Sequence, residues 1–507
     1  MKRSIIFLSL LLATATAFAN PVGKERAARV AQNAVIRFCA ELDGITPAGA
    51  PVELTDVSQG LGYNLLHIYK YRYAGVEGFI IVSGDDCTDP ILAFSDKGEL
   101  DLSGTVASEA DRIGIAGPGF HYQLRHYTEE IWAAREAKAT APANIARRWQ
   151  RYEEEVLPGK GDFYNDIIES LLGSMRWGQS SPYNTKCPGG SVTGCVATAF
   201  GMIMNYWDYP EHGFGQHSYN GADNPAAYPD WTYGVLSADF EHTYYDWAHM
   251  NDYLNISGDD TATEAISTLL FHIGVALDMH YTPNGSGCWS LPEYAIFDTS
   301  LHLSPDMGAD TRIPRHFGYR YDYAGMRDSI GNDSLWLHML YNSLVEGKPI
   351  YYAGWAKDTS EAGHSGTSGH GYVIDGYFSD EIDSNFFGIN WGWNGTANGY
   401  FKLDAMTPQG YDFTQWHGAI IGLEPDTSYH GYTSIRPVDN GQRATVNSTV
   451  GHITVEGAEG LDVDVYDIMG RHIVSARVTY SRWQTPVRPG IYIVRVDGHP
   501  YKTIVLK

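Results

Sequence analysis

The chain has 507 residues, of which 43% are hydrophobic and 19% are charged, and its formal net charge is −25. A chain of this length is expected to form about two to four domains with sizeable cores, and its composition argues against wholesale disorder. Its acidic balance argues against a nucleic-acid partner, because binding to phosphate requires clustered lysine and arginine.

Residues 1–19 are predicted to be a secretory signal peptide. Lys2 and Arg3 precede a short apolar run, and the tripeptide Ala-Phe-Ala at 17–19 supplies a small-x-small cleavage site. A membrane anchor is the alternative, but two threonines interrupt the run, and no later segment has about 18 uninterrupted apolar residues. We therefore expect export without an integral membrane span.

Export makes disulfides possible, and an odd number of cysteines leaves at least one thiol unpaired. We hypothesise that Cys187 and Cys288 form a bridge, which would leave Cys195 free. The five cysteines are Cys39, Cys87, Cys187, Cys195 and Cys288.

The segment from 20 to 160 is predicted to be an α+β domain. A helix is expected over 24–42, and strands are expected within 63–73, 78–86 and 91–101. Residues 106–157 are rich in Ala, Glu and Arg and are predicted to form a helix and an exposed connector. Four basic residues make this a plausible region for proteolytic processing: Arg147, Arg148, Arg151 and Lys160.

The next block, 161–425, is richer in Gly, Tyr, Trp, Asn and His. A second helical stretch is expected at 262–277, and several strands are expected near the end of the block. After it, 426–507 alternates apolar and polar residues with period two between Gly and Pro turns. This pattern predicts a small β-sandwich.

Cys195 is predicted to lie at the start of a buried helix. Apolar residues follow it at helical spacing, and Pro210 requires the helix to stop near Asp208. Unpaired N–H groups and the helix dipole at this end favour a thiolate and could stabilise an oxyanion. A packed core thiol is the alternative, so a base is needed. The apolar stripe comprises Val196, Ala199, Phe200, Ile203, Met204 and Trp207.

His370 is the candidate base, because glycines flank it in SGTSGHGYVIDGY and leave room for a substrate backbone. The runs 370–378 and 386–393 are predicted to form a hairpin with Asn390 level with His370. An amide there could orient the imidazole, as in a Cys–His–Asn site, and Trp391 and Trp393 could exclude water. A turn histidine and core tryptophans are the alternatives. The sequence has no H-E-x-x-H, G-x-S-x-G or phosphate-loop motif.

At these residues the sequence resembles the streptopain family of papain-like cysteine peptidases. The matching stretches follow in order across about 170–425: WGQSSPYN, TGCVATAFGMIMNYWDYP, HIGVALDMHYTPNGSG, KPIYYAGW, SGHGYVIDGY and GINWGWNGTANGYFKLDAM. The resemblance implies a two-lobed α+β papain-type fold with Cys195 as nucleophile and His370 as general base. It also implies that Gln179 and the N–H of Cys195 form the oxyanion hole. Asn390, Trp391 and Trp393 fall in the segment that supports the histidine, and no metal or organic cofactor is implied.

The flanking segments resemble other parts of such enzymes. GFIIVSGDDCTDPILAFSDKGELD resembles the inhibitory propeptide of the family, which implies that the chain is its own inhibitor until cut between about 145 and 165. VDVYDIMGRHI, PGIYIVRVDG and YKTIVLK resemble the C-terminal sorting domain of the type IX secretion system. That resemblance implies a secretion machinery as partner, and passage through the periplasm to the surface or medium of a Gram-negative bacterium.

The expected organisation is a signal peptide (1–19), an inhibitory propeptide (20–160), a peptidase domain (161–425) and a C-terminal β-sandwich (426–507). We expect a secreted cysteine endopeptidase that is made as a zymogen and cuts proteins through a thioester acyl-enzyme. The alternatives are a catalytically silent adhesin or peptide-binding protein on the same fold, and a transglutaminase-like acyltransferase that uses the same Cys–His pair.

Overall fold

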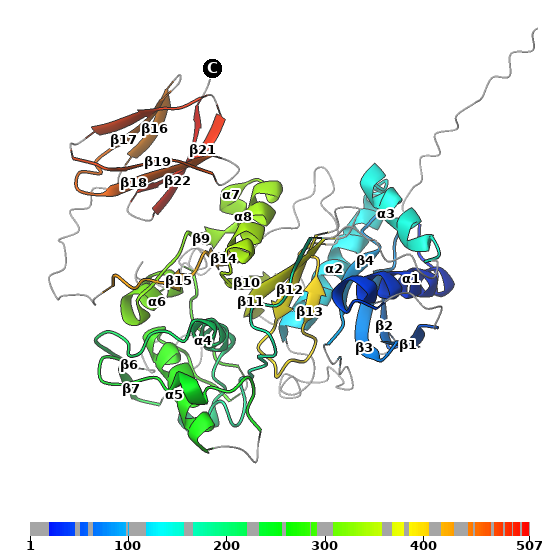
Figure 1. Cartoon of the computed structure of the whole chain (residues 1–507), viewed down its shortest axis with the longest axis horizontal. Coiled ribbons are helices and arrows are strands. Elements are labelled where there is room, and N and C mark those ends of the chain that lie inside the picture. Colours follow the sequence, from blue (N-terminus) through cyan, green and yellow to red (C-terminus); the bar gives the residue numbers. More distant parts are fainter. Residues whose placement is uncertain are drawn as a thin grey trace, which may run out of the picture. The chain divides into compact units, whose positions relative to one another are not determined.

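The computed structural model of the chain describes most of residues 20–505, so the predicted signal peptide lies outside the described residues (Figure 1). Within the described part, no helix is long and apolar enough to cross a membrane. The ranges left out after residue 20 are 46–50, 59–63, 98–99, 101–117, 157–165, 221–232, 256–259, 284, 292–307, 357–367, 380–384, 405–416, 430–444, 450–451, 468–470, 480–481, 489, 497–498 and 506–507.

The chain forms two compact units. The first combines residues 1–96, 124–163 and 404–413, and the second combines 97–123, 164–403 and 414–507. One helix, α2 (Pro118–Glu136), therefore contributes its first turns to the second unit and the remainder to the first unit.

In the first unit, helix α1 packs on an antiparallel sheet of strand order β1-β2-β3-β4. The apolar residues of α1 are mostly alanine and valine, so its backbone can approach the sheet closely, and Phe38 stacks on Phe94 of β4. The predicted helix and strands of this segment are thereby confirmed. The elements are α1 (Lys24–Leu42), β1 (Glu53–Asp56), β2 (Leu66–Tyr73), β3 (Val76–Ser83), β4 (Ile91–Ser95) and α3 (Ala143–Glu153).

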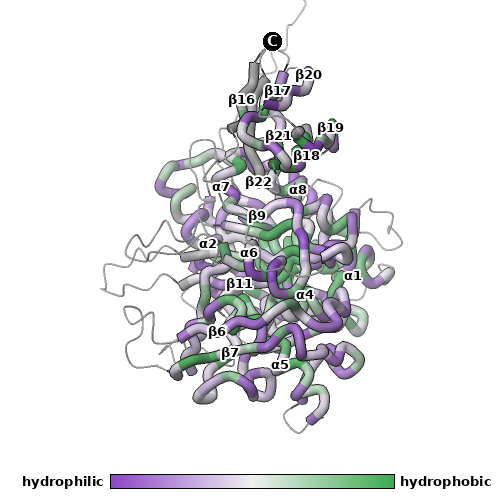
Figure 2. The backbone as a smooth tube through the Cα atoms, turned by 90° about the vertical axis from the view of Figure 1, so that its left-hand side faces the viewer, coloured by the Kyte–Doolittle hydropathy of each residue, from purple (hydrophilic) through white to green (hydrophobic). Residues whose placement is uncertain are grey.

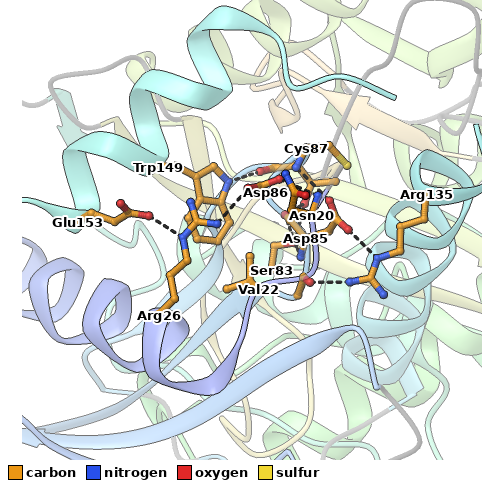
Figure 3. A network of polar contacts seen from close by, with 12 residues as sticks. Asn20, Val22, Arg26, Ser83, Asp85, Asp86, Cys87, Arg135, Trp149 and Glu153 are labelled. Carbon is orange, nitrogen blue, oxygen red and sulfur yellow. Dashed lines mark hydrogen bonds and ion pairs between the residues drawn. The ribbon is translucent and has the colours of Figure 1, made fainter. Parts of the chain in front are cut away.

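Helix α3 confirms that a helix lies within 106–157, and it is an integral part of this unit, so the expected exposed connector does not include it. Trp149 is buried, and its indole N–H donates to the carbonyl of Thr88 at 2.8 Å. Arg26 of α1 lies over the Trp149 ring and forms ion pairs with Glu153 at 2.6 Å and with Asp86 at 3.0 Å (Figure 3). Helix α3 is therefore held by apolar packing and by the ion pair from Arg26 of α1 to its last residue, Glu153.

The second unit contains an antiparallel sheet of strand order β13-β12-β11-β10-β14-β9, and β5 also pairs with β11. Long strands β10 and β11 lie at its centre, and both are rich in buried aromatic and aliphatic residues. The strands are β5 (Asp166–Ile168), β9 (Tyr323–Met326), β10 (Ile350–Ala356), β11 (Ser368–Ser379), β12 (Asn385–Asn390), β13 (Gly399–Phe401) and β14 (Gly418–Ile421).

Helices α4 and α5 lie side by side in this unit, and α4 also contacts β11 and β10 (Figure 1). Helix α4 spans Cys195–Trp207 and α5 spans Asp260–Ala276, so both predicted helices are confirmed. Residues on nearly every side of α4 are buried, because it lies between α5 and the sheet. The remaining elements are β6 (Gln216–Asn220), β7 (Val235–Asp239), α6 (Ala309–Phe317), β8 (Tyr319–Arg320), α7 (Arg327–Ile330), α8 (Asp333–Val345) and β15 (Glu424–Pro425).

The C-terminal segment forms two antiparallel sheets, of order β16-β17-β20 and β19-β18-β21-β22, that share one apolar core. Hydrophilic and hydrophobic residues alternate along β18, as a strand with one buried face requires (Figure 2). The predicted β-sandwich is thereby confirmed. Its strands are β16 (Thr445–Thr449), β17 (His452–Glu456), β18 (Asp462–Asp467), β19 (His472–Arg477), β20 (Arg482–Pro486), β21 (Gly490–Val496) and β22 (His499–Val505).

Candidate active site

Cys195 is the first residue of α4, as predicted from the helix phase. Gly194 precedes it with φ 88°, a conformation that other residues rarely adopt. A Cβ at Gly194 would also lie 2.8 Å from the end of the Met279 side chain and 3.1 Å from the carbonyl oxygen of Ser286. The glycine therefore allows the sharp turn that places the thiol at the N-terminal end of a buried helix.

Cys195 is half-buried as a residue, and its sulfur accepts a hydrogen bond from the N–H of Gly371 at 3.3 Å. Burial raises the pKa of Cys195, and the N–H groups of Gly371, Val196 and Cys195 itself oppose this change. The sequence predicts a thiolate favoured by the helix end. In the uncleaved chain, however, the loss of hydration outweighs the backbone donors, so the thiol form is favoured.

His370 lies on β11, beside the start of α4, because the next residue, Gly371, bonds to the thiol. Its Nε2 lies 3.0 Å from the carbonyl oxygen of Trp391 and 3.3 Å from the indole nitrogen of Trp393. Burial lowers the pKa of His370 to about 4, and the bond to Trp391 opposes this shift. The imidazole is therefore neutral at pH 7, and its Nε2 is directed toward Trp391.

Asn390 does not lie level with His370, contrary to the predicted register. It pairs with Val373, and Ile374 and Gly376 flank a bulge in the ladder. Its side-chain N–H donates to the carbonyl of Met175 at 2.7 Å, and its side-chain oxygen accepts from the N–H of Gly392 at 3.1 Å. The Asn390 side chain therefore fixes the backbone that follows β12. The imidazole of His370 contacts the carbonyl oxygen of Trp391 and not the Asn390 amide.

The structure places both predicted tryptophans beside His370. The centroid of its ring is 6.3 Å from that of Trp391 and 6.1 Å from that of Trp393. Trp391 is fully buried and donates its indole N–H to the carbonyl of Ala397 at 3.0 Å, whereas Trp393 is half-buried. The two indoles therefore cover the imidazole on one side and limit its contact with water.

Gln179 is buried beside the segment that leads into α4. Its backbone carbonyl accepts from the N–H of Thr193 at 3.0 Å, two residues before Cys195. Among the described residues, its side-chain nitrogen is buried without a hydrogen-bond partner. A buried donor that lacks a partner is costly, which makes this amide a candidate donor to a bound ligand.

The first turns of α2 occupy the same neighbourhood, which the sequence did not predict. A Cβ at Gly119 would lie 2.2 Å from Cδ2 of His370 and 2.7 Å from Cε3 of Trp391. Tyr122 contacts Gly354, the residue paired with His370 on β10, and its hydroxyl lies 3.3 Å from Nε2 of His417. The only sequence signal for this contact is the Gly-Pro-Gly run at 117–119.

All five cysteines are free thiols, so the hypothesised bridge between Cys187 and Cys288 is absent. Burial raises the pKa of Cys187 to about 12, which makes its thiol inert at neutral pH. Cys288 is half-buried, and burial raises its pKa well above the ordinary range. Cys195 therefore does not depend on a neighbouring disulfide to remain free.

A thiol that begins a buried helix, an imidazole on the adjoining strand and an unpaired amide donor nearby define the class of papain-like thiol peptidases. The family model for the peptidase C10 family matches residues 177–401. The model described as Spi protease inhibitor matches 19–111, and a domain of unknown function, DUF6383, matches 433–505. Residues 177–401 therefore form a domain of the peptidase C10 family, the streptopain family.

Relatives of known name agree with this assignment. Streptopain of Streptococcus pyogenes is 26% identical over 446 residues, which cover 84% of this chain and 99% of streptopain. The thiol protease/hemagglutinin PrtT of Porphyromonas gingivalis is 26% identical over 447 residues, covering 84% of this chain and 44% of PrtT.

Solved structures from Prevotella intermedia are also similar. A prointerpain A fragment has 26% identity and a TM-score of 0.50, and the match covers 73% of this chain and 98% of the fragment. Active interpain A has 33% identity and a TM-score of 0.39, covering 50% of this chain and 94% of interpain A.

The protein is a streptopain-like cysteine protease with an N-terminal inhibitor prodomain, and it has the papain-like fold. The predicted α+β class and zymogen organisation are thereby confirmed. Its partners include protein substrates and its own propeptide. These findings favour the protease over the silent adhesin and the transglutaminase-like acyltransferase.

Proposed function

We propose that the protein is a secreted endopeptidase in which Cys195 attacks the scissile carbonyl and His370 moves the protons. The imidazole takes the thiol proton, and the thiolate sulfur bonds to the carbonyl carbon. His370 then protonates the departing amine, which leaves a thioester. Water, deprotonated by the same imidazole, cleaves the thioester and restores the thiol.

The observation that carries this proposal is the 3.3 Å hydrogen bond from the N–H of Gly371 to the sulfur of Cys195. It fixes the backbone next to His370 against the end of α4, so the histidine and the cysteine lie on adjoining elements. The imidazole does not need to be brought in from a separate loop.

The first turns of α2 support the proposal that Cys195 and His370 are inactive in the uncleaved chain. Gly119 lies against the ring of His370, whose Nε2 bonds to the carbonyl of Trp391 in the uncleaved chain. Removing the prosegment would hydrate the site, which raises the pKa of His370 and lowers the pKa of Cys195. Both changes favour the thiolate–imidazolium pair, so we propose that cleavage of the propeptide activates the enzyme.

We propose that Gln179 and the N–H of Cys195 form the oxyanion hole. Replacing Gln179 by alanine is expected to lower kcat by about 10²–10³-fold with little change in KM, because the donor acts on charge that develops in the transition state. Steady-state hydrolysis of a peptide substrate by the processed enzyme measures both constants.

Gln216→Ala is the matched control for this prediction, because Gln216 is an exposed glutamine on β6 of the same unit. It is expected to leave both constants unchanged. A Gln179→Ala enzyme with unaltered kcat would remove Gln179 from the proposed site.

We also propose the domain boundaries 1–19, 20–160, 161–425 and 426–507. The family models support these boundaries. The model over 177–401 falls inside the proposed peptidase domain, and the model over 433–505 falls inside the proposed sandwich. The model over 19–111 begins one residue before the proposed propeptide. Burial of α3 supports a maturation cut after Glu153, because a cut among Arg147, Arg148 and Arg151 would divide a helix packed on α1.

We propose that the C-terminal β-sandwich directs secretion through the type IX system to the surface or medium of a Gram-negative bacterium. The predicted signal peptide and the separate apolar core of the sandwich support this, as do relatives in Porphyromonas gingivalis and Prevotella intermedia. A chain that lacks 426–507 is expected to accumulate in the periplasm while its peptidase activity is retained.

Pulse-chase labelling with cell fractionation tests the sorting proposal. Arg477→Ala, which changes one exposed side chain of the sandwich, is the control and should be secreted like the unaltered chain. The proposal would be contradicted if the truncated chain were secreted as efficiently as the unaltered chain and the mature extracellular form of the unaltered chain still carried the sandwich.

A further inference from the structure

Three side chains of the kinds that bind metal ions meet in the first unit. His126 and Glu130 lie one turn apart on α2, and Asp404 reaches them from a distant part of the sequence. Nε2 of His126 is 3.3 Å from Oε1 of Glu130 and 3.6 Å from Oδ1 of Asp404. One ligand atom from each residue lies within 4.8 Å of the other two.

The cluster is sheltered from water. The exposed fractions of the side chains are 9% for His126, 0% for Glu130 and 11% for Asp404. Burying a carboxylate is costly unless an opposite charge or a metal compensates for it. Two carboxylates with one neutral imidazole carry a formal charge of about −2, which matches a divalent cation.

We propose that His126, Glu130 and Asp404 bind a divalent transition-metal ion, with Zn²⁺ as the best match. Zinc binds nitrogen and carboxylate oxygen at about 2.0–2.2 Å in a tetrahedron, whose ligands are then about 3.3–3.6 Å apart. The distances from Nε2 to the two carboxylates already have these values, so the side chains need little rearrangement. Water would complete the tetrahedron, and imidazole favours zinc over magnesium or calcium.

A protonated His126 between two carboxylates is the competing explanation for the same distances. Such an ion triad would keep about one net negative charge among the three side chains, whereas Zn²⁺ with a neutral imidazole would keep none. The two explanations differ in one measurable respect, which is saturable binding of the metal at one site per chain.

The consequence for the zymogen rests on the proposed domain boundaries. His126 and Glu130 belong to the propeptide, and Asp404 belongs to the peptidase portion. A bound ion would join the two portions with three coordinate bonds, and maturation would remove two of the three ligands. The metal would therefore stabilise the uncleaved chain and not the processed enzyme.

The test uses the full chain carrying Cys195→Ala, so that neither proteolysis nor the catalytic thiol contributes. Calorimetric titration with ZnCl₂ is expected to show one equivalent bound and a rise in Tm. Asp404→Asn and His126→Gln are each expected to weaken binding at least about tenfold, since each removes one coordinate bond. Co²⁺ in place of Zn²⁺ should give the visible absorption of a tetrahedral site.

The matched control is His217→Gln, which removes the imidazole of another His–Asp pair, with Nε2 2.6 Å from Asp278. It should leave zinc affinity unchanged. Failure of the Cys195→Ala chain to bind zinc, or binding that neither Asp404→Asn nor His126→Gln weakens, would overturn the proposal and leave the ion triad. Neither result bears on the catalytic proposal, because the test contains no active thiol.

Discussion

Replacing Cys195 by alanine is expected to lower kcat/KM by about 10⁴–10⁶-fold and to stop self-processing of the zymogen. The reason is that no other atom of the site can form the thioester. His370→Ala should cost about as much, and the double variant should be little worse, because a nucleophile and its base act as a unit. Peptide hydrolysis after processing by an added protease gives the rates.

Cys288→Ser is the control for this prediction, because Cys288 is another partly exposed free thiol of the same unit. It is expected to hydrolyse the peptide at a rate close to that of the unaltered enzyme. Iodoacetamide should inactivate both the unaltered and the Cys288→Ser enzymes by modifying Cys195. Substantial hydrolysis by the Cys195→Ala enzyme would refute the assignment of the nucleophile.

Gly119→Ala is expected to weaken latency in the uncleaved chain. The new Cβ would lie 2.2 Å from an imidazole carbon of His370 and 2.7 Å from the indole of Trp391, and rigid rings cannot yield as a flexible chain end can. Overpacking of this kind costs about 1–3 kcal/mol, so alkylation of Cys195 should accelerate on the order of tenfold. Intact-mass analysis at early times separates labelled uncleaved chain from processed enzyme.

Gly23→Ala is the control for the Gly119 variant, because a Cβ at this helix-capping position in the first unit would meet nothing within 4 Å. Alanine also favours helix over glycine, so faster labelling of Gly119→Ala cannot be attributed to loss of α2. Unchanged or slower labelling of Cys195 would contradict a latch at the first turn of α2.

The helices and strands of the site were predictable because burial of one face sets the spacing of their apolar residues. The apolar stripe after Cys195 has a clear helical phase, and Pro210 limits its extent, so α4 begins at Cys195 and ends at Trp207, beside the predicted stop near Asp208. The C-terminal sandwich was predicted for the same reason, since a strand with one buried face alternates residue by residue.

The register of the histidine hairpin was not predictable in the same way. The estimate of its centre assumed a regular ladder, whereas the structure has a bulge between Ile374 and Gly376 and pairs Ser379 with Asn385. A small displacement of the turn changes which side chains face each other. Asn390 consequently bonds to Met175 in place of His370.

The ionisation of the pair also could not be read from the sequence. A helix end favours a thiolate only when the hydration lost by the sulfur is replaced, and replacement depends on which segment covers the site. Here the first turns of α2 lie against His370, and the Gly-Pro-Gly run at 117–119 does not indicate which part of the chain it meets. The contribution of the prosegment is therefore a property of the tertiary structure.

The continuity of α2 has a mechanical consequence. Gly119 and His126 are seven residues apart on one helix, which is a rise of about 10 Å along its axis. The turn that presses on His370 therefore cannot withdraw alone unless backbone hydrogen bonds of the helix break. Any effect of ligand binding near His126 on the unmasking of His370 is reciprocal, so each would alter the free energy of the other by the same amount.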